Sequence, residues 1–231
     1  MREDSDHAAD SSTPSLGDLA MPRRPSAVPY DEGDDYDAHA LLEVNGLSDD
    51  RDELIGLLDS GIGILQAAAA RTLGAQGERS AIEQLRRLAG DVDVEETVRV
   101  QAAYALARMD VGGAKQMILD VLRLPAEASP GPLQAAAALA RLGDPIGFEI
   151  VRRSLESPNP VTAMIACKQL FAFASLAGQP LDGGGTVDLY EAFRRALSRP
   201  ERNIAGEARA QLLALDTDQA RTILEADLED R

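Results

Sequence analysis

A segment rich in alanine and leucine occurs three times in the chain at a constant spacing. The three copies span residues 65–74, 98–109 and 132–145. When they are aligned, Leu73, Leu106 and Leu139 occupy the same position, and each follows the previous one by 33 residues. A fixed period of this size is typical of solenoids, in which each repeat buries its apolar face against the next. The period therefore predicts a solenoid and constrains the fold more than any single motif does.

The amino-acid composition indicates that the repeats are helical. Aromatic residues make up 3% of the chain and tryptophan is absent, so the core must consist of alanine, leucine, isoleucine and valine. Such a core suits closely stacked helices better than a sheet sandwich. We therefore predict an all-α protein, a right-handed α-solenoid of about five helical hairpins.

The formal net charge of −16 bears on the possible partners. An acidic surface repels phosphate groups, which disfavours binding to nucleic acids and to anionic membranes. Acidity also keeps a repeat protein in solution, and this effect alone can explain the charge. We therefore expect a protein partner, and neither a nucleic acid nor a membrane.

The features of the chain that report on its compartment indicate the cytoplasm. Cys167 is the single cysteine, so no intramolecular disulfide can form and a reducing compartment is permitted. The first residues lack the basic and apolar regions of a signal peptide. No apolar run approaches the roughly 20 residues that a membrane helix needs. We expect a soluble cytoplasmic protein.

Residues 1–37 differ in composition from the rest of the chain. They contain four prolines, ten acidic and three basic residues, and they cannot bury enough apolar surface to offset the entropy lost on ordering. We expect a disordered acidic tail over residues 1–37 and the solenoid over residues 38–231. The tail either only improves solubility or carries a recognition segment around Leu16, Leu19 and Met21, which docks on a partner or on the solenoid.

Apolar periodicity and helix-start signals place the helices of the solenoid. Clear helices are expected at about residues 62–73, 78–88, 94–109 and 114–122. Asp144 and Pro145 form a cap-plus-proline start for a later helix. Another helix is expected to start near Val161 and to continue to Leu176. Thr217 then caps a last, more polar helix that suits the end of a solenoid.

The second helices of the hairpins share the pattern Val-Arg-x-x-Ala-Ala-x-Ala-Leu-x-x-x-Gly/Asp. Its best copy contains Val98, Arg99, Ala102, Ala103, Ala105, Leu106 and Asp110. The Thr-Pro-Leu-His element of ankyrin repeats and the Trp/Gly/Tyr pattern of tetratricopeptide repeats are missing. The pattern resembles HEAT repeats, specifically the short bacterial HEAT-like repeats of the phycobiliprotein-lyase type, over roughly residues 50–215. The resemblance implies a binding surface and does not define a reaction, because function depends on sites added to a fold.

Side chains at equivalent positions of the second helices form a candidate contact surface. The resemblance implies that these helices line the concave face of the solenoid. The candidate residues are Arg71, Tyr104, Arg108, Arg141 and Lys168. We interpret these five residues, called the basic stripe below, as a contact surface for an acidic peptide or partner domain. The alternative is that they are solubilising charges on exposed helix faces, paired with nearby carboxylates.

The chain offers few residues for catalysis. Its two histidines, His7 and His39, lie outside the repeats, so neither a Ser-His-Asp triad nor a histidine-based metal site is available there. Cys167 aligns with core alanines of the other repeats and is interpreted as a buried apolar residue. The glycine run at residues 183–185 lacks the Lys-Ser/Thr pair of a P-loop. No catalytic residue, metal or cofactor is predicted.

The apolar residues near the end of the fourth hairpin leave two interpretations open. Phe171, Phe173 and Leu176 cannot all point the same way on an α-helix. Either the glycine-rich insertion at residues 178–186 covers the additional face, or an apolar patch is exposed to a partner. We favour coverage by the insertion.

The sequence therefore predicts a non-enzymatic scaffold or adaptor that binds another protein through the concave face. One alternative is a bilin lyase or isomerase, because the repeat type is named for such proteins, although no residue that would handle a tetrapyrrole stands out. A second alternative is a HEAT-like DNA glycosylase. That activity would need a strongly basic groove and aromatic residues for the exposed nucleotide, which a chain with a net charge of −16 does not indicate.

Overall fold

The computed structural model describes residues 33–126 and 129–229, with side chains from residue 38 onward. These residues form an all-α structure. The α-helices are α1 (Gly33–Val44), α2 (Arg51–Leu57), α3 (Gly63–Gln76), α4 (Ile82–Gly90), α5 (Glu96–Arg108), α6 (Ala114–Leu122), α7 (Gly131–Arg141), α8 (Phe148–Ser154), α9 (Pro160–Gln169), α10 (Leu189–Leu197), α11 (Arg202–Leu215) and α12 (Asp218–Glu229). The 3₁₀-helices are η2 (Arg79–Ala81), η3 (Pro145–Gly147) and η4 (Leu170–Leu176).

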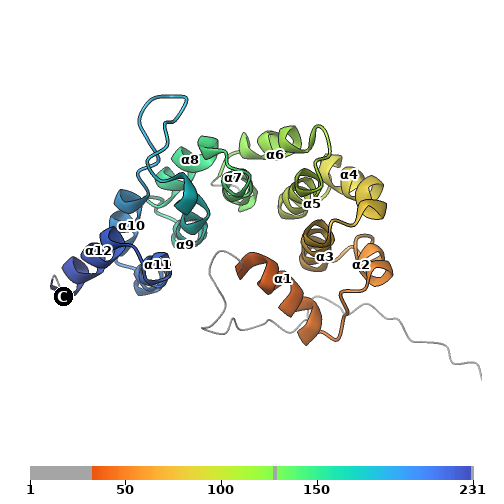
Figure 1. Cartoon of the computed structure of the whole chain (residues 1–231), viewed down its shortest axis with the longest axis horizontal. Helices are drawn as coiled ribbons and strands as arrows, with labels where there is room; N and C mark the ends of the chain where they lie inside the picture. Colours follow the sequence, from red (N-terminus) through yellow and green to blue (C-terminus); the bar gives the residue numbers. More distant parts are fainter. Residues whose placement is uncertain (1–32, 127–128, 230–231) are drawn as a thin grey trace, which may run out of the picture.

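Consecutive helices pair into hairpins, from α2–α3 to α10–α11. The two helices of each hairpin pack against each other, and the second helices pack against one another in the order α3, α5, α7, α9, α11. Figure 1 shows that the second helices form the inner layer of an arc and the first helices its outer layer. The predicted all-α solenoid of helical hairpins is confirmed.

The leucines that define the period lie in the core of the arc. Leu73, Leu106 and Leu139 are completely buried, on α3, α5 and α7 respectively. Burying a leucine side chain contributes about 1.5–3 kcal/mol, so each repeat stabilises its neighbours through the same position. Ala102 and Ala135 are also fully buried, and their small side chains let the helices approach one another.

Two glycines occupy positions where the packing leaves no room for a side chain. A β-carbon on Gly74 of α3 would lie 2.6 Å from the Cα and 2.7 Å from the Cβ of Ala105 on α5. A β-carbon on Gly147 of η3 would lie 2.5 Å from the Cα of Ala136 on α7. Backbone meets backbone at both contacts, which explains why the hairpins stack so closely.

Side-chain caps define where several helices begin. The carboxylate of Asp50 accepts a hydrogen bond from the backbone N–H of Asp52 at 2.9 Å. Asp144 caps η3 in the same way, and Asn159 caps α9. Such caps satisfy backbone donors that have no partner within the helix. The predicted cap-plus-proline start at Asp144 is confirmed, except that the chain first makes the short turn η3 before entering α8.

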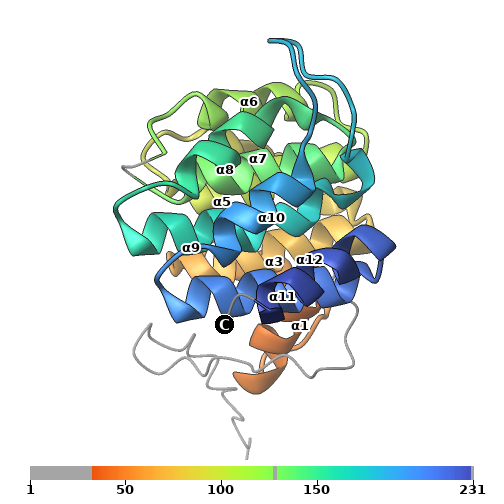
Figure 2. The same ribbon diagram turned by 90° about the vertical axis from the view of Figure 1, so that its left-hand side faces the viewer.

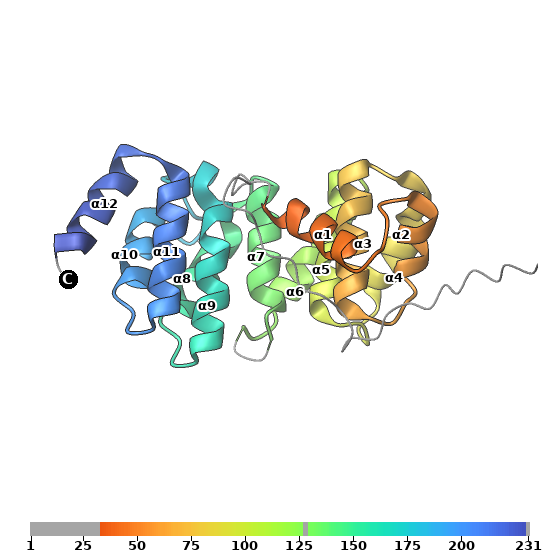
Figure 3. The same cartoon turned by 90° about the horizontal axis from the view of Figure 1, so that it is seen from below.

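Helix α1 begins earlier than expected and lies inside the arc. Its first residue is Gly33, whereas the start of the solenoid was predicted at residue 38. It packs against α3 on the inner side of the arc (Figures 1 and 3), with Leu41 and Leu42 buried. Residues 1–32, the rest of the predicted tail, lie outside the described residues.

The segment after α9 corrects the prediction of one continuous α-helix to Leu176. The α-helix ends at Gln169 and continues as the 3₁₀-helix η4. The change of winding buries Phe173, whose ring meets the ring of Phe148 on α8 edge-on, with the centroids 5.3 Å apart. Phe171 is half-buried.

The glycine-rich insertion, which we expected to cover the additional apolar face, packs one partly buried side chain, Leu181, against the core. Residues 178–186 extend away from the helical layers (Figures 1 and 2), and most of their side chains are exposed. A single antiparallel β-bridge joins Pro180 to Thr186 at the base of this insertion. Helix α8 therefore covers Phe173 through Phe148.

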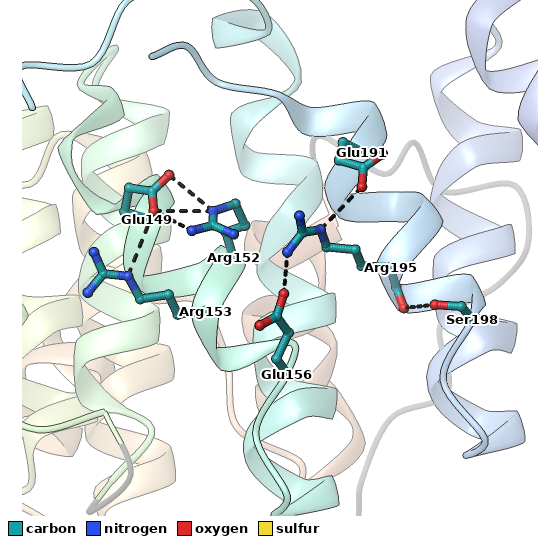
Figure 4. A network of polar contacts seen from close by, with 7 residues as sticks. All are labelled: Glu149, Arg152, Arg153, Glu156, Glu191, Arg195 and Ser198. Atoms are coloured by element: carbon teal, nitrogen blue, oxygen red, sulfur yellow. Dashed lines mark hydrogen bonds and ion pairs between the residues drawn. The ribbon is translucent and has the colours of Figure 1, made fainter. Parts of the chain in front are cut away.

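Ion pairs join the outer helices α8 and α10. Figure 4 shows Glu149 accepting hydrogen bonds from Arg152, the shortest at 2.8 Å, while Arg153 lies 3.8 Å away. Arg195 of α10 pairs with Glu191 on its own helix and with Glu156, which lies just beyond the C-cap residue of α8. Arg195 therefore connects two neighbouring hairpins on the outer layer.

This network makes part of the stability depend on pH. The hydrogen bonds from Arg152 hold the pKa of the Glu149 carboxyl below its ordinary value of 4.5, and burial opposes this shift only in part. A lowered pKa in the folded state means that the stabilisation is complete above pH 4.5 and is lost as the pH falls through the lowered pKa. We expect Glu149→Gln to lower the free energy of unfolding at pH 7 by about 0.5–1 kcal/mol, since the pair is partly exposed.

Urea unfolding at pH 7 and at pH 3 checks this expectation. The difference between the wild type and Glu149→Gln should shrink at pH 3, because the wild-type carboxyl then begins to protonate as well. The same change at Glu225, an exposed residue of α12, is the control. A Glu149→Gln effect of equal size at both pH values would show that the ion pair is not its cause.

Candidate binding surface

Three residues of the basic stripe come together on α3 and α5. The guanidinium carbon of Arg71 lies 5.2 Å from the centroid of the Tyr104 ring. The guanidinium carbon of Arg108, one turn further along α5, lies 5.9 Å from the same centroid. Cation–π contacts contribute about 0.5–1 kcal/mol at exposed sites and more when they are desolvated. The tyrosine thus holds two arginines of neighbouring hairpins in place.

Two members of the basic stripe are buried, whereas a contact surface requires exposed side chains. Arg71 and Tyr104 each retain 7% of their accessible surface. Arg71 Nη1 donates a hydrogen bond to Gln101 Oε1 at 3.2 Å, and α1 packs against α3, the helix that carries Arg71. Both side chains therefore connect α3 to α5 and present little surface to a partner.

The other three members lie at the ends of successive inner helices. Arg108, Arg141 and Lys168 belong to the last turns of α5, α7 and α9. Arg108 and Lys168 are exposed, and Arg141 is half-buried. Each hairpin reverses the chain twice, so the inner helices run in the same direction, and these three residues form a row along one edge of the inner layer. We call them the cationic row.

The helix dipole gives the cationic row a structural role as well. A positive side chain in the last turn of a helix contributes about 0.3–1 kcal/mol through the dipole. Because the three residues lie at helix ends, their charged groups are at the edge of the inner layer. The row can therefore stabilise the helices and still meet a negatively charged partner.

Cys167 is buried, as the alignment of the repeats indicated. Its side chain has no accessible surface, and its Sγ lies 3.6 Å from the carbonyl oxygen of Ile204. Burial raises the pKa of the thiol to about 12. The reactive thiolate is thus scarce at neutral pH, which does not suit a nucleophile.

A second group of basic residues was not predicted from the sequence. Arg194, Arg199, Arg202 and Arg209 line one cavity at the C-terminal end of the arc. A signal was present, because residues 194–209 contain five arginines, the four that line the cavity and Arg195, which is unusual in a chain of net charge −16. The residues lie on two helices and the connection between them, so no helical periodicity links them.

The two layers of stacked hairpins define an α-helical repeat protein. A protein-family model described as PBS lyase HEAT-like repeat matches residues 65–91, which include most of α3 together with η2 and α4. Residues 65–91 are thus similar to a HEAT-like repeat of the phycobiliprotein-lyase type, in agreement with the resemblance seen in the sequence. No curated protein matches the sequence. In the part of the chain that the structure describes, no helix combines the length and the apolar character needed to cross a bilayer.

Proposed function

We propose that this protein is a non-enzymatic scaffold or adaptor that binds an acidic partner protein through the inner layer of the arc. The cationic row carries the proposal: Arg108, Arg141 and Lys168 lie at the same end of three consecutive inner helices. The extended curved surface of a helical solenoid suits the binding of another protein.

The charge of the whole molecule makes the cationic row selective. With a net charge of −16, most of the surface repels an acidic partner, whereas the row attracts it. Complementary charges of this kind fix the orientation of a complex and increase its rate of formation. Single exposed ion pairs contribute only about 0–1 kcal/mol, so the row acts through several charges together.

An affinity capture from the native lysate, followed by titration of the captured protein, tests the proposal. The bait is the full chain, and the test variant is Arg108→Glu with Lys168→Glu. We expect the dissociation constant of the captured protein to rise at least tenfold, which is about 1.4 kcal/mol. The matched control is Arg86→Glu with Arg123→Glu, which changes the net charge equally at exposed positions of the outer layer and should leave binding within about twofold.

Several results would contradict the proposal. Equal weakening by both double variants would show that only the net charge matters. Loss of the partner after removal of residues 1–32, with α1 intact, would place the binding site in that N-terminal segment. Retention of a coloured or nucleic-acid component in place of a protein would favour the bilin or DNA alternatives.

A further inference from the structure

A cavity of about 830 Å³ lies at the C-terminal end of the arc, between α10, α11 and α12. Ligand pockets in proteins typically measure about 300–1,000 Å³, so this cavity has the size of a small-molecule site. Its lining contains four arginines, Arg194, Arg199, Arg202 and Arg209, and one carboxylate, Asp227. Such a lining is unusual in a protein whose net charge is −16.

Helix α12 bounds the cavity on one side. It follows α11 through Asp216, which adopts a left-handed conformation with φ of 47°, and it then runs obliquely to α10 and α11 (Figure 3). The start of α12 is anchored, because Thr217 bonds to the Tyr190 hydroxyl at 2.9 Å and Ala220 is fully buried. Further along, α12 forms a wall of the cavity with Ile223, Ala226 and Asp227.

Two of the arginines are held in fixed positions. Arg209 makes two hydrogen bonds to Asp227 of α12, at 2.7 and 3.2 Å. Arg199 makes two hydrogen bonds to Glu201, at 2.9 and 2.8 Å. Paired hydrogen bonds of this kind restrict the guanidinium plane. Arg199 and Arg209 are therefore ordered before any ligand enters, which lowers the entropy cost of binding.

Arg202 provides a positive charge that is not paired with a carboxylate of the described residues. Its side chain is exposed at the start of α11 and forms no hydrogen bond or ion pair with any side chain in the described part of the structure. Its guanidinium group is free to bind an anion that enters the cavity. A guanidinium group presents donors in a fork that matches both phosphate and carboxylate oxygens.

Apart from Ser198, the remaining lining is apolar. Leu197 of α10, Ala205 of α11 and Ile223 of α12 contribute to it, and Ala205 and Ile223 are largely buried. An apolar surface next to a group of arginines favours a ligand that has both characters. A bare inorganic anion would leave the apolar part of the cavity unused.

We propose that this cavity binds a small organic anion, in which a phosphate or carboxylate group meets Arg202 and an apolar body lies against Ile223. The site is separate from the cationic row, since it lies on α10, α11 and α12. Its ligand is thus independent of the partner proposed for the inner layer.

Calorimetric titration of the full chain with two probes, hexyl phosphate and hexanoate, tests the proposal. We expect at least one of them to bind more tightly than inorganic phosphate and than hexanol, each of which offers only one half of the ligand. The tighter probe identifies the head group. Arg202→Gln should weaken its binding at least tenfold, whereas Arg86→Gln, a change on the exposed surface of α4, should not.

A second pair of variants tests the location of the site. Ala226→Phe places a ring in the cavity from its exposed wall and should abolish binding, whereas Ala210→Phe, at an exposed residue of α11 outside the lining, should not. Thermal melting confirms that each variant is folded. Absence of binding by both probes, or binding that neither Arg202→Gln nor Ala226→Phe weakens, would overturn the proposal.

Discussion

Replacement of Gly74 by alanine is expected to destabilise the protein by about 2–3 kcal/mol, because the new β-carbon overpacks a closely fitted contact. That atom would lie 2.6 Å from the Cα of Ala105 and 2.7 Å from its Cβ. Neither atom can rotate away, so α3 and α5 must move apart. Leu73 and Leu106 lie fully buried beside this contact, and separation of the helices would loosen their packing as well.

The same substitution at Gly206 provides the matched control. Gly74 and Gly206 both lie inside helices of 14 residues, α3 and α11, but a β-carbon at Gly206 meets nothing within 4 Å. Alanine is the better helix former by about 0.5–1 kcal/mol, so Gly206→Ala should stabilise the protein. In thermal melts the two variants should shift in opposite directions, by about 2–4 °C for each kcal/mol. Stabilisation of both would show that α3 and α5 are not in such close contact.

The period of 33 residues was sufficient to predict the layers and the core. Leu73, Leu106 and Leu139 are fully buried at equivalent positions, because a repeat that recurs at fixed spacing must present the same face to each neighbour. The capping residues Asp144 and Thr217 likewise placed two helix starts correctly, since a cap acts within a few residues of its own position. Local rules and the repeat together therefore predicted the fold.

The features that depend on contacts distant in sequence were not predictable in this way. The alignment placed Arg71 and Tyr104 in one column, yet the burial of both depends on how α3, α5 and the segments around them pack. The position of α1 against α3 likewise depends on a contact outside the repeat. Similarly, the arginines around the C-terminal cavity converge only because α12 runs obliquely to α10 and α11.

The 3₁₀-helix η4 has a cause that lies on another helix. In a continuous α-helix, the N–H of Phe171 would donate to the carbonyl oxygen of Cys167, four residues earlier. In the structure the side-chain amide of Gln211, on α11, stands between them. The Phe171 N–H donates to Gln211 Oε1 at 3.0 Å, and Gln211 Nε2 donates to the Cys167 oxygen at 2.8 Å. A side chain inserted into the helical hydrogen bonds is a known cause of helix distortion.

Gln211 could have been noticed in the sequence. Ile204, Ala208, Gln211 and Leu215 follow the spacing of an apolar helix face, and the glutamine is the polar residue among them. A polar side chain on such a face must find a hydrogen-bond partner when it is buried. The sequence alone cannot show that this partner is the backbone of α9.

Replacement of Gln211 by leucine is expected to destabilise the protein by about 2–3 kcal/mol. The side chain is completely buried. Leucine is similar to glutamine in size and fits the site, but it leaves the Phe171 N–H without the Gln211 acceptor. An unsatisfied buried donor costs about 1–3 kcal/mol, and the loss of the second hydrogen bond adds to this. Urea unfolding measures the loss, and Gln219→Leu on the exposed face of α12, with an expected effect within about 0.5 kcal/mol, is the control.

Hydrogen exchange at the Phe171 amide distinguishes two responses to Gln211→Leu. If the inserted amide is required to satisfy the backbone, protection of Phe171 should be lost in the variant along with stability. If instead α9 closes its own hydrogen bond from Phe171 to Cys167, protection and stability would both persist and η4 would become α-helical. The second result would mean that Gln211 does not maintain the contact between Phe173 and Phe148, whose ring centroids lie 5.3 Å apart. The first would show that one side chain on the fifth hairpin determines how the fourth hairpin ends.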